Sequence, residues 1–318
     1  MTLLLESLRI ENYRLFKRFE ISRLGRVNLL VGRNNSGKST ILEAVRLYAS
    51  AGSFEVLRSI LESHDDLRLD DDQSAVKQLF HGRTAQWTDA SEIRIGPVGS
   101  DRPVSIRVVD VPSSRFPVTE ERARIFAPFS DSSRHVYVSP NGLTAETAAR
   151  LWDLIALTDL EQDVTDVLKI ISADVERISF IGESGRKRVP MAKLSSENQP
   201  VALRSLGDGV NRLLGIALSL AYARGGVLLI DEVENGVHFS AQQQMWRVIF
   251  RLSHRLATQV FATTHSWDCI EAFQQAAAAD PNEEAALVRL DVHDDAVSPT
   301  SFSERELAIV TRDQIEVR

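Results

Sequence analysis

A segment near the start of the chain carries the first residues whose types and spacing indicate chemistry. It reads Gly32-Arg33-Asn34-Asn35-Ser36-Gly37-Lys38-Ser39, after the apolar run Val27–Val31 and before apolar residues at helical spacing from Ser39 to Tyr48. Glycines let backbone N–H groups approach phosphate oxygens, and a helix N-terminus adds its positive dipole end. Lys38 would supply charge to the β- and γ-phosphates, and the Ser39 hydroxyl would bind Mg²⁺.

The order of strand, glycine loop and helix is the one that a P-loop requires, so the segment predicts a site for ATP and Mg²⁺. The alternative is a chance glycine turn that joins a strand to a helix. The residues expected to contact the nucleotide are Gly32, Arg33, Asn34, Asn35, Ser36, Gly37, Lys38, Ser39 and Thr40.

A second apolar run, Val227–Ile230, ends in two carboxylates, Asp231 and Glu232. At the carboxyl end of a parallel strand these side chains would lie where such sheets bind ligands. Asp231 would hold Mg²⁺ directly or through water, and Glu232 would orient and deprotonate the attacking water. The alternative is an acidic helix cap after a buried strand.

A third run, Gln259–Ala262, leads into Thr263-Thr264-His265-Ser266. His265 would contact the γ-phosphate and help to position the water, and the alternative is a structural histidine. Its place after the carboxylate pair favours the functional role. The catalytic candidates are therefore Glu232, His265 and Lys38, and the metal-binding candidates are Ser39 and Asp231.

Three sections of chain must position these residues. Alternating residues from Leu5 to Ile21 indicate one or two half-buried strands, and with the P-loop and residues 200–270 they would form an α/β core lobe. Residues 51–199 are less regular, with short strands and one or two helices between 145 and 171, and are expected to form a middle lobe. Residues 271–318 would add a strand pair and a short tail.

Composition excludes several classes of protein. The 318 residues are 43% hydrophobic and 25% charged, as in ordinary globular proteins. A net charge of −7 argues against a protein coated in nucleic acid, and a single cysteine, Cys269, excludes an internal disulfide. No apolar run approaches the ~20 residues of a membrane helix, and the early Glu6 argues against a signal peptide. We expect a soluble, cytoplasmic protein without a membrane partner.

The combined motifs resemble those of ABC-type ATPases of the SMC, RecF and OLD group, most closely the short AAA15-like ATPases of bacterial and phage-defence loci. The resemblance covers both core sections well and the middle only loosely. It implies a P-loop NTPase fold with an ABC-ATPase-like head over residues 1–318. The segments that carry it are Asn12–Phe16, Gly32–Ser39, Ser205–Arg212, Asp231–His238 and Thr263–Ser266.

This resemblance implies a head-to-tail homodimer, in which the signature segment of one subunit closes over ATP held by the other. Ser205, Asp208 and Gly209 would then contact a γ-phosphate in trans, with the following helix adding its N-terminal dipole. The position that normally holds the signature serine is Gly207, so the hydroxyl contact is in doubt while the backbone contacts are not. Alternatively, the segment is a glycine turn before a helix.

Other family features are less defined in this chain. Glu234-Asn235-Gly236 matches the D-loop, which in such dimers touches the opposite site, and a simple turn is the alternative. A Q-loop glutamine cannot be assigned among Gln73, Gln78 and Gln86. Tyr13 either stacks on adenine or, as we favour, packs a strand.

Three functions compete on this sequence. The first is a dimeric ATPase that acts on DNA or on a separate effector protein, in defence against phage. Its candidate contact with a DNA backbone is Arg186-Lys187-Arg188, for which a solvated hairpin tip is the favoured alternative. The second is an ATP-gated scaffold that sequesters and releases a toxin or nuclease with little turnover. The third is a transporter subunit, which the missing Q-loop glutamine and signature serine disfavour. Because 53 residues follow His265, fewer than the ~100 of a further domain, we expect no nuclease.

Overall fold

The computed structural model describes most of the chain. The described residues are 3–64, 77–83, 92–101, 103–110, 123–126, 132–169, 172–182, 188–279, 284–293, 296–302 and 306. The sequence predictions that concern Gln73, Gln86 and Arg186–Lys187 lie outside these residues.

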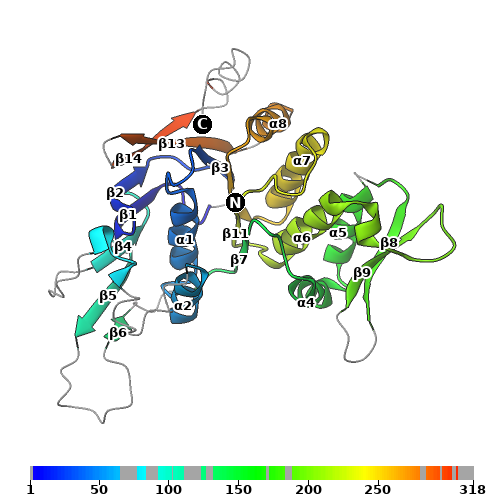
Figure 1. Ribbon diagram of the computed structural model, residues 1–318, viewed down its shortest axis with the longest axis horizontal. Helices are drawn as coiled ribbons and strands as arrows, with labels where there is room; N and C mark the ends of the chain where they lie inside the picture. The colour runs from blue at the N-terminus through cyan, green and yellow to red at the C-terminus, as the bar shows by residue number, and fades with distance from the viewer. Residues whose placement is uncertain are drawn as a thin grey trace, which may run out of the picture.

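A six-stranded sheet of order β14-β13-β3-β12-β11-β7 lies at the centre of the molecule (Figure 1). Its strands are parallel except for β14, which pairs antiparallel with β13 at one edge. The three apolar runs predicted to be strands are confirmed, because each is buried along its whole length as expected for strands covered on both faces. The strands are β3 (Val27–Gly32), β7 (His135–Val138), β11 (Val227–Ile230), β12 (Gln259–Thr264), β13 (Ala285–His293) and β14 (Ala296–Phe302).

Helices cover both faces of this sheet, and alternate residues of each strand face opposite sides. Leu29 packs into one hydrophobic cluster with the helices α6, α7 and α8, whereas its neighbour Leu30 packs into a second cluster with α1 and α2. The helices are α1 (Lys38–Ala49), α2 (Phe54–Ser63), α6 (Asp208–Tyr222), α7 (Phe239–Arg255) and α8 (Trp267–Ala277).

The N-terminal strands belong to a separate antiparallel sheet of order β2-β1-β4-β5-β6, which packs on the α1 side of the molecule. The turn after β1 is also bridged to residue 80, just before the short helix η2 (His81–Arg83). The strands of this sheet are β1 (Leu8–Tyr13), β2 (Phe16–Ile21), β4 (Glu92–Gly96), β5 (Val104–Asp110) and β6 (Ala123–Phe126).

A lobe of helices and a small sheet projects from the other side of the molecule (Figure 1). One or two helices were predicted between residues 145 and 171; two form there, and both pack on α6. A three-stranded sheet of order β10-β9-β8 completes the lobe. Its elements are α4 (Ala145–Ile155), α5 (Asp159–Lys169), β8 (Val175–Ile181), β9 (Val189–Leu194), β10 (Val201–Ala202) and the short helix η3 (Leu203–Leu206).

The section 51–199, expected as one middle lobe, is distributed over three places. Strands β4 to β6 extend the N-terminal sheet, β7 joins the central sheet beside β11, and only the part from α4 onward forms the projecting lobe. The division follows strand pairing between residues about 80 or more positions apart, which local periodicity does not report. Among the described residues, no helix combines the length and apolarity needed to cross a membrane.

Candidate active site

The P-loop is a tight turn that only glycine allows at two positions. Gly32 and Gly37 have φ values of 150° and 95°. A Cβ on Gly37 would lie 2.7 Å from Cζ of Phe16, and one on Gly32 would lie 2.7 Å from Oγ of Ser36. Helix α1 starts directly after Gly37 without a side-chain cap, so its first N–H groups are free to bind an anion such as phosphate.

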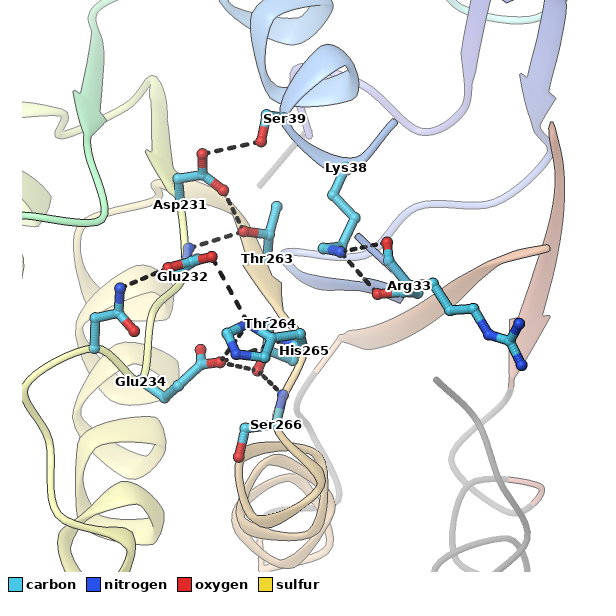
Figure 2. A network of polar contacts seen from close by, with 12 residues as sticks. Arg33, Lys38, Ser39, Asp231, Glu232, Glu234, Thr263, Thr264, His265 and Ser266 are labelled. Carbon is cyan, nitrogen blue, oxygen red and sulfur yellow. Dashed lines mark hydrogen bonds and ion pairs between the residues drawn. The ribbon is translucent and has the colours of Figure 1, made fainter. Parts of the chain in front are cut away.

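Lys38 lies folded over this loop in Figure 2. Its Nζ donates to the carbonyl oxygens of Gly32 at 2.7 Å and Arg33 at 2.9 Å. Burial lowers the pKa of Lys38, and the nearby carboxylates of Asp231 and Glu232 oppose this shift. A phosphate between the loop and these carboxylates would therefore meet a partly desolvated ammonium group, for which charge neutralisation is favourable.

Asp231 is the acceptor for three hydroxyl groups from three different elements. Ser39 on α1 and Tyr137 on β7 donate to Oδ2, at 3.0 and 3.3 Å. Thr263 on β12 donates to Oδ1 at 2.5 Å. The predicted metal residues Ser39 and Asp231 thus meet at the carboxyl ends of the central strands, and their hydroxyl and carboxylate oxygens are the ligands that Mg²⁺ prefers. The residues present fit this ion.

The backbone of Glu232 adopts the left-handed conformation, with φ of 45°. Its N–H donates to Oγ1 of Thr263 at 2.8 Å, and its carboxylate accepts from Nδ2 of Asn235 at 2.6 Å. Nδ1 of His265 lies 3.7 Å from Oε1 of Glu232 (Figure 2). The carboxylate and the imidazole predicted to be catalytic are therefore neighbours, and both are partly exposed to solvent.

Glu234 belongs to the segment that matches a D-loop, with a simple turn as the alternative, and its side chain points into its own chain. It is 8% exposed. Oε1 accepts from Oγ1 of Thr264 at 2.7 Å and from the N–H of His265 at 3.3 Å. Ser266 follows and caps α8 by accepting from the N–H of Cys269. The segment Thr263–Ser266 thus combines one candidate catalytic residue with three that set its position.

The signature segment turns before α6 through Gly207, whose φ of 107° and ψ of 154° favour glycine. Ser205 donates its hydroxyl to the carbonyl of its own chain at Ala202, and Asp208 is exposed and pairs with Arg204. Within the described part of the chain, no hydrogen bond or ion pair joins Ser205, Asp208 or Gly209 to residues 32–40. The structure therefore does not bring the predicted signature residues into the site of their own chain.

Arg212 is the last residue of the motif segment Ser205–Arg212, but no role was assigned to it from the sequence. It lies one turn into α6, is 7% exposed, and donates to the carbonyl oxygens of Ser139 at 2.9 Å, Asp231 at 3.1 Å and Glu232 at 2.9 Å. Burial lowers the pKa of its guanidinium. Arg212 therefore ties the helix that follows the signature to the turn that carries the candidate base.

Three other sequence predictions have structural outcomes. Tyr13 is fully buried and donates its hydroxyl to Glu43 at 2.9 Å, so it packs a strand, as favoured, and does not stack on a base. Cys269 is buried, which raises the pKa of its thiol to about 12. Arg188 forms an ion pair with Asp153, 2.6 Å away, at the base of the hairpin whose tip was the candidate DNA contact.

Tyr137 and Thr263 were also missed as parts of the site. Thr263 lies in a quoted motif, but its role emerges only from the pairing of β12 with β11. Tyr137 lies on a four-residue strand without a motif. Burial and the Asp231 carboxylate raise the pKa of its phenol well above the usual value, so the group remains a hydrogen-bond donor. Tyr137 comes next to Asp231 because β7 pairs in parallel with β11, a long-range contact that the residues around Tyr137 do not indicate.

Comparison with known proteins places this geometry in context. The model of a family described as AAA ATPase domain matches residues 4–80 and 143–270. A Helicobacter pylori protein named ATP/GTP phosphatase is 23% identical over 86% of this chain and 88% of its own length. The DNA replication and repair protein RecF of Rickettsia felis is 36% identical, but over only 29% of this chain and 26% of its own.

Solved structures of SMC heads have the same fold. A head bound to the C-terminal winged-helix domain of ScpA superposes with a TM-score of 0.58 at 12% identity, covering 94% of this chain and 97% of that one. The SMC head domain of Thermotoga maritima superposes with a TM-score of 0.52 at 14% identity, covering 94% and 98%. At this level of identity the likeness concerns the fold alone.

Proposed function

The chain belongs to the AAA ATPase domain family, and from that premise we propose that it hydrolyses ATP with Mg²⁺ as a dimer and couples its nucleotide state to a separate effector protein or to DNA. The observation that carries the proposal is the meeting of the P-loop serine, Asp231, Glu232 and His265 at the ends of β3, β11 and β12. The name of the similar Helicobacter pylori protein, ATP/GTP phosphatase, supports the reaction class.

In this proposal each residue has a role that its geometry supports. The N–H groups of the P-loop and of α1 bind the phosphates, and Lys38 exchanges its two backbone carbonyls for phosphate oxygens. Ser39 and Asp231 hold Mg²⁺, which neutralises charge on the phosphates when bound. Glu232 orients the attacking water and accepts its proton, while His265, partly exposed beside it, contacts the γ-phosphate.

The dimer follows from the resemblance to ABC-type ATPases, and the geometry of the signature supports it. Gly209 and the start of α6 make no polar contact with the described P-loop of their own chain, and Asp208 is exposed. A second subunit that offers its α6 N-terminus would supply positive dipole charge to the γ-phosphate. The similar SMC head is bound to a domain of ScpA, and RecF is named a DNA replication and repair protein, which supports a protein partner and DNA as the two targets. A role in defence against phage is the part of the proposal that rests on resemblance alone.

The second candidate is an ATP-gated scaffold that holds a toxin or nuclease with little turnover. Two observations favour it. Gly207 stands where a signature serine is expected, so a hydroxyl contact to the γ-phosphate is lost. In addition, Asn235 already occupies one oxygen of the Glu232 carboxylate, which restrains the base.

The deciding experiment measures ATP turnover against protein concentration, with and without duplex DNA. We expect specific activity to rise with concentration, because each site needs two subunits, and to vanish in Lys38→Ala. Lys17→Ala, which removes an exposed lysine of β2, is the matched control and should retain activity. If the protein binds ATP but its hydrolysis rate is near zero at every protein concentration, the result contradicts the ATPase proposal and supports the scaffold. Stimulation by DNA would identify DNA as the ligand.

A further inference from the structure

Tyr137 reaches the metal-binding carboxylate from a strand that carries no recognised motif. On β7 it pairs in register with Leu229 of β11, two residues before Asp231. The backbone of the two strands continues past this pair, since the N–H of Asp231 donates to the carbonyl of Val138 at 2.9 Å. The hydrogen bonds between β7 and β11 therefore fix the backbone position of Tyr137 relative to Asp231, whose carboxylate the Tyr137 hydroxyl contacts.

The ring itself is also held in place. The guanidinium of Arg46, on α1, lies over it at 5.5 Å from the ring centroid, a distance at which a cation attracts an aromatic face. Ser39, two turns earlier on the same helix, donates to the same oxygen of Asp231 as the Tyr137 hydroxyl. Helix α1 therefore orients two of the three hydroxyl donors, one directly and one through Arg46.

Asp231 has about four lone-pair positions, and three of them accept hydroxyl hydrogens in this structure. Thr263 alone occupies Oδ1, whereas Ser39 and Tyr137 share Oδ2. If the Ser39 hydroxyl oxygen bound a metal ion, the Tyr137 hydroxyl would remain as a donor to Oδ2. It would then keep the Asp231 carboxylate from rotating. No glutamine among the described residues hydrogen-bonds to Asp231 or Ser39, so Tyr137 supplies the polar group on the β7 side of the site.

We propose that Tyr137 is a positioning residue of the Mg²⁺ site, whose hydroxyl holds the Asp231 carboxylate in the orientation that binds the hydrated ion together with Ser39. The inference rests on the proposed function, because it requires a magnesium nucleotide at the P-loop. It concerns metal affinity and leaves metal-free nucleotide binding to the P-loop unchanged.

The test titrates Mg²⁺ into the full chain saturated with ATPγS and follows the rise of the melting temperature. In Tyr137→Phe, the Mg²⁺ concentration at half-maximal rise should increase about 10-fold, the loss usual when a group that orients a metal ligand is removed. Binding of ATPγS in EDTA should not change. Tyr48→Phe is the matched control, since Tyr48 is another tyrosine of the α1 region that packs against Gly96, and it should titrate as the wild type.

Two results would overturn the inference. One is a Tyr137→Phe titration that coincides with the wild type. The other is a melting temperature that falls equally with and without Mg²⁺, which indicates a merely structural hydroxyl. A wild type whose melting temperature does not respond to magnesium nucleotide at all would instead contradict the proposed function and remove this inference with it.

A spectroscopic measurement makes the result independent of the stability of the variant. The chain has four tyrosines, so 3-fluorotyrosine labelling gives few ¹⁹F resonances, and that of Tyr137 is the one missing in Tyr137→Phe. Addition of Mg²⁺ to the ATPγS complex should move this resonance more than that of Tyr48. An unmoved Tyr137 resonance, with the melting temperature raised, would overturn the proposal.

Discussion

Glu232 illustrates how the local backbone prepares a side chain for its role. A left-handed conformation at a residue other than glycine costs about 1–3 kcal/mol unless surrounding contacts maintain it. Here the N–H of Glu232 is held by Thr263, and its carbonyl oxygen is held by Arg212. The turn directs the carboxylate toward His265 at the open end of the site. This cost at a single residue is consistent with a catalytic position.

Replacing Glu232 by Gln should therefore separate binding from chemistry. The amide is nearly isosteric but accepts no proton, so turnover should fall by about 10²- to 10⁴-fold while ATP affinity is retained. Single-turnover hydrolysis and equilibrium ATP binding measure the two quantities. Glu176→Gln, at an exposed carboxylate of β8, should leave both unchanged. Near-normal hydrolysis in Glu232→Gln would mean that another group activates the water.

At the scale of elements, the first turns of α6 have an exposed side, which is available to a second subunit, and a buried side, which contacts the candidate site. Its N-terminus at Asp208 is exposed and available to a second subunit, while Arg212 faces inward to the carbonyl oxygens of Ser139, Asp231 and Glu232. The first of these carbonyls ends β7 and the other two follow β11. Arg212 thereby connects α6 to the turn that carries the candidate base.

Arg212→Met should reveal this link as a loss of stability. The methionine keeps much of the volume but leaves buried carbonyl oxygens without donors, which lowers the free energy of unfolding by about 2–4 kcal/mol. Urea denaturation of the nucleotide-free chain measures the change. Arg247→Met, at an exposed position of α7, should remain within about 0.5 kcal/mol of the wild type. Equal midpoints for the two variants would show that α6 is anchored by its apolar face alone.

The elements that the sequence predicted are those whose signals are local. The P-loop, with the strand before it and the helix after it, occupies consecutive residues. Strand β11 is an unbroken apolar run before Asp231, and β12 contains the apolar stretch 260–262 before Thr263. The missed contacts depend on pairing between distant segments. Tyr137 meets Asp231 only because β7 lies beside β11, and Arg212 meets Glu232 only because α6 packs against the end of β11. Nothing in the residues around Tyr137 or Arg212 indicates these neighbours.

The dependence on pairing between distant segments also explains why residues 51–199 do not form a single middle lobe. Alternation around Ile93 and Ile106 predicted strands, and those strands form. It did not predict that β4 pairs with β1, across more than 80 residues of chain, because alternation describes one face of a strand and not its partner. Residue types thus identified the chemistry, whereas the assignment of the middle section required the sheet order.

At the scale of the whole molecule, the central sheet separates two sets of functional residues. The P-loop and the two carboxylates occupy the ends of its strands, while the signature turn starts α6 in front of the projecting lobe (Figure 1). Ser205 hydrogen-bonds within its own turn, and a Cβ on Gly209 would lie 3.4 Å from the carbonyl oxygen of Gly236, in van der Waals contact with it. A Cβ at Gly209 therefore fits the fold of one subunit, and retained ATP binding is the check that a longer side chain leaves the P-loop undisturbed.

A mixture of two inactive variants tests the proposed dimer directly. Lys38→Ala removes the P-loop lysine, and Gly209→Glu places a negative charge where the γ-phosphate of the other subunit would bind. In a two-fold dimer, the mixed species combines the intact P-loop of one variant with the intact signature of the other at one of its two sites. If dimers form at random, a 1:1 mixture should recover about a quarter of wild-type activity although each variant alone is inactive.

Controls make this outcome specific to sites shared between subunits. Gly209→Glu alone should bind ATP as tightly as the wild type, because its P-loop is unchanged. A mixture of Lys38→Ala with Glu232→Gln should recover no ATPase activity, because both changes disable the same half of the site. Activity of Gly209→Glu alone would contradict a role for the signature. A mixture that remains inactive, while Gly209→Glu still binds ATP, would place all catalytic groups of each site in one subunit.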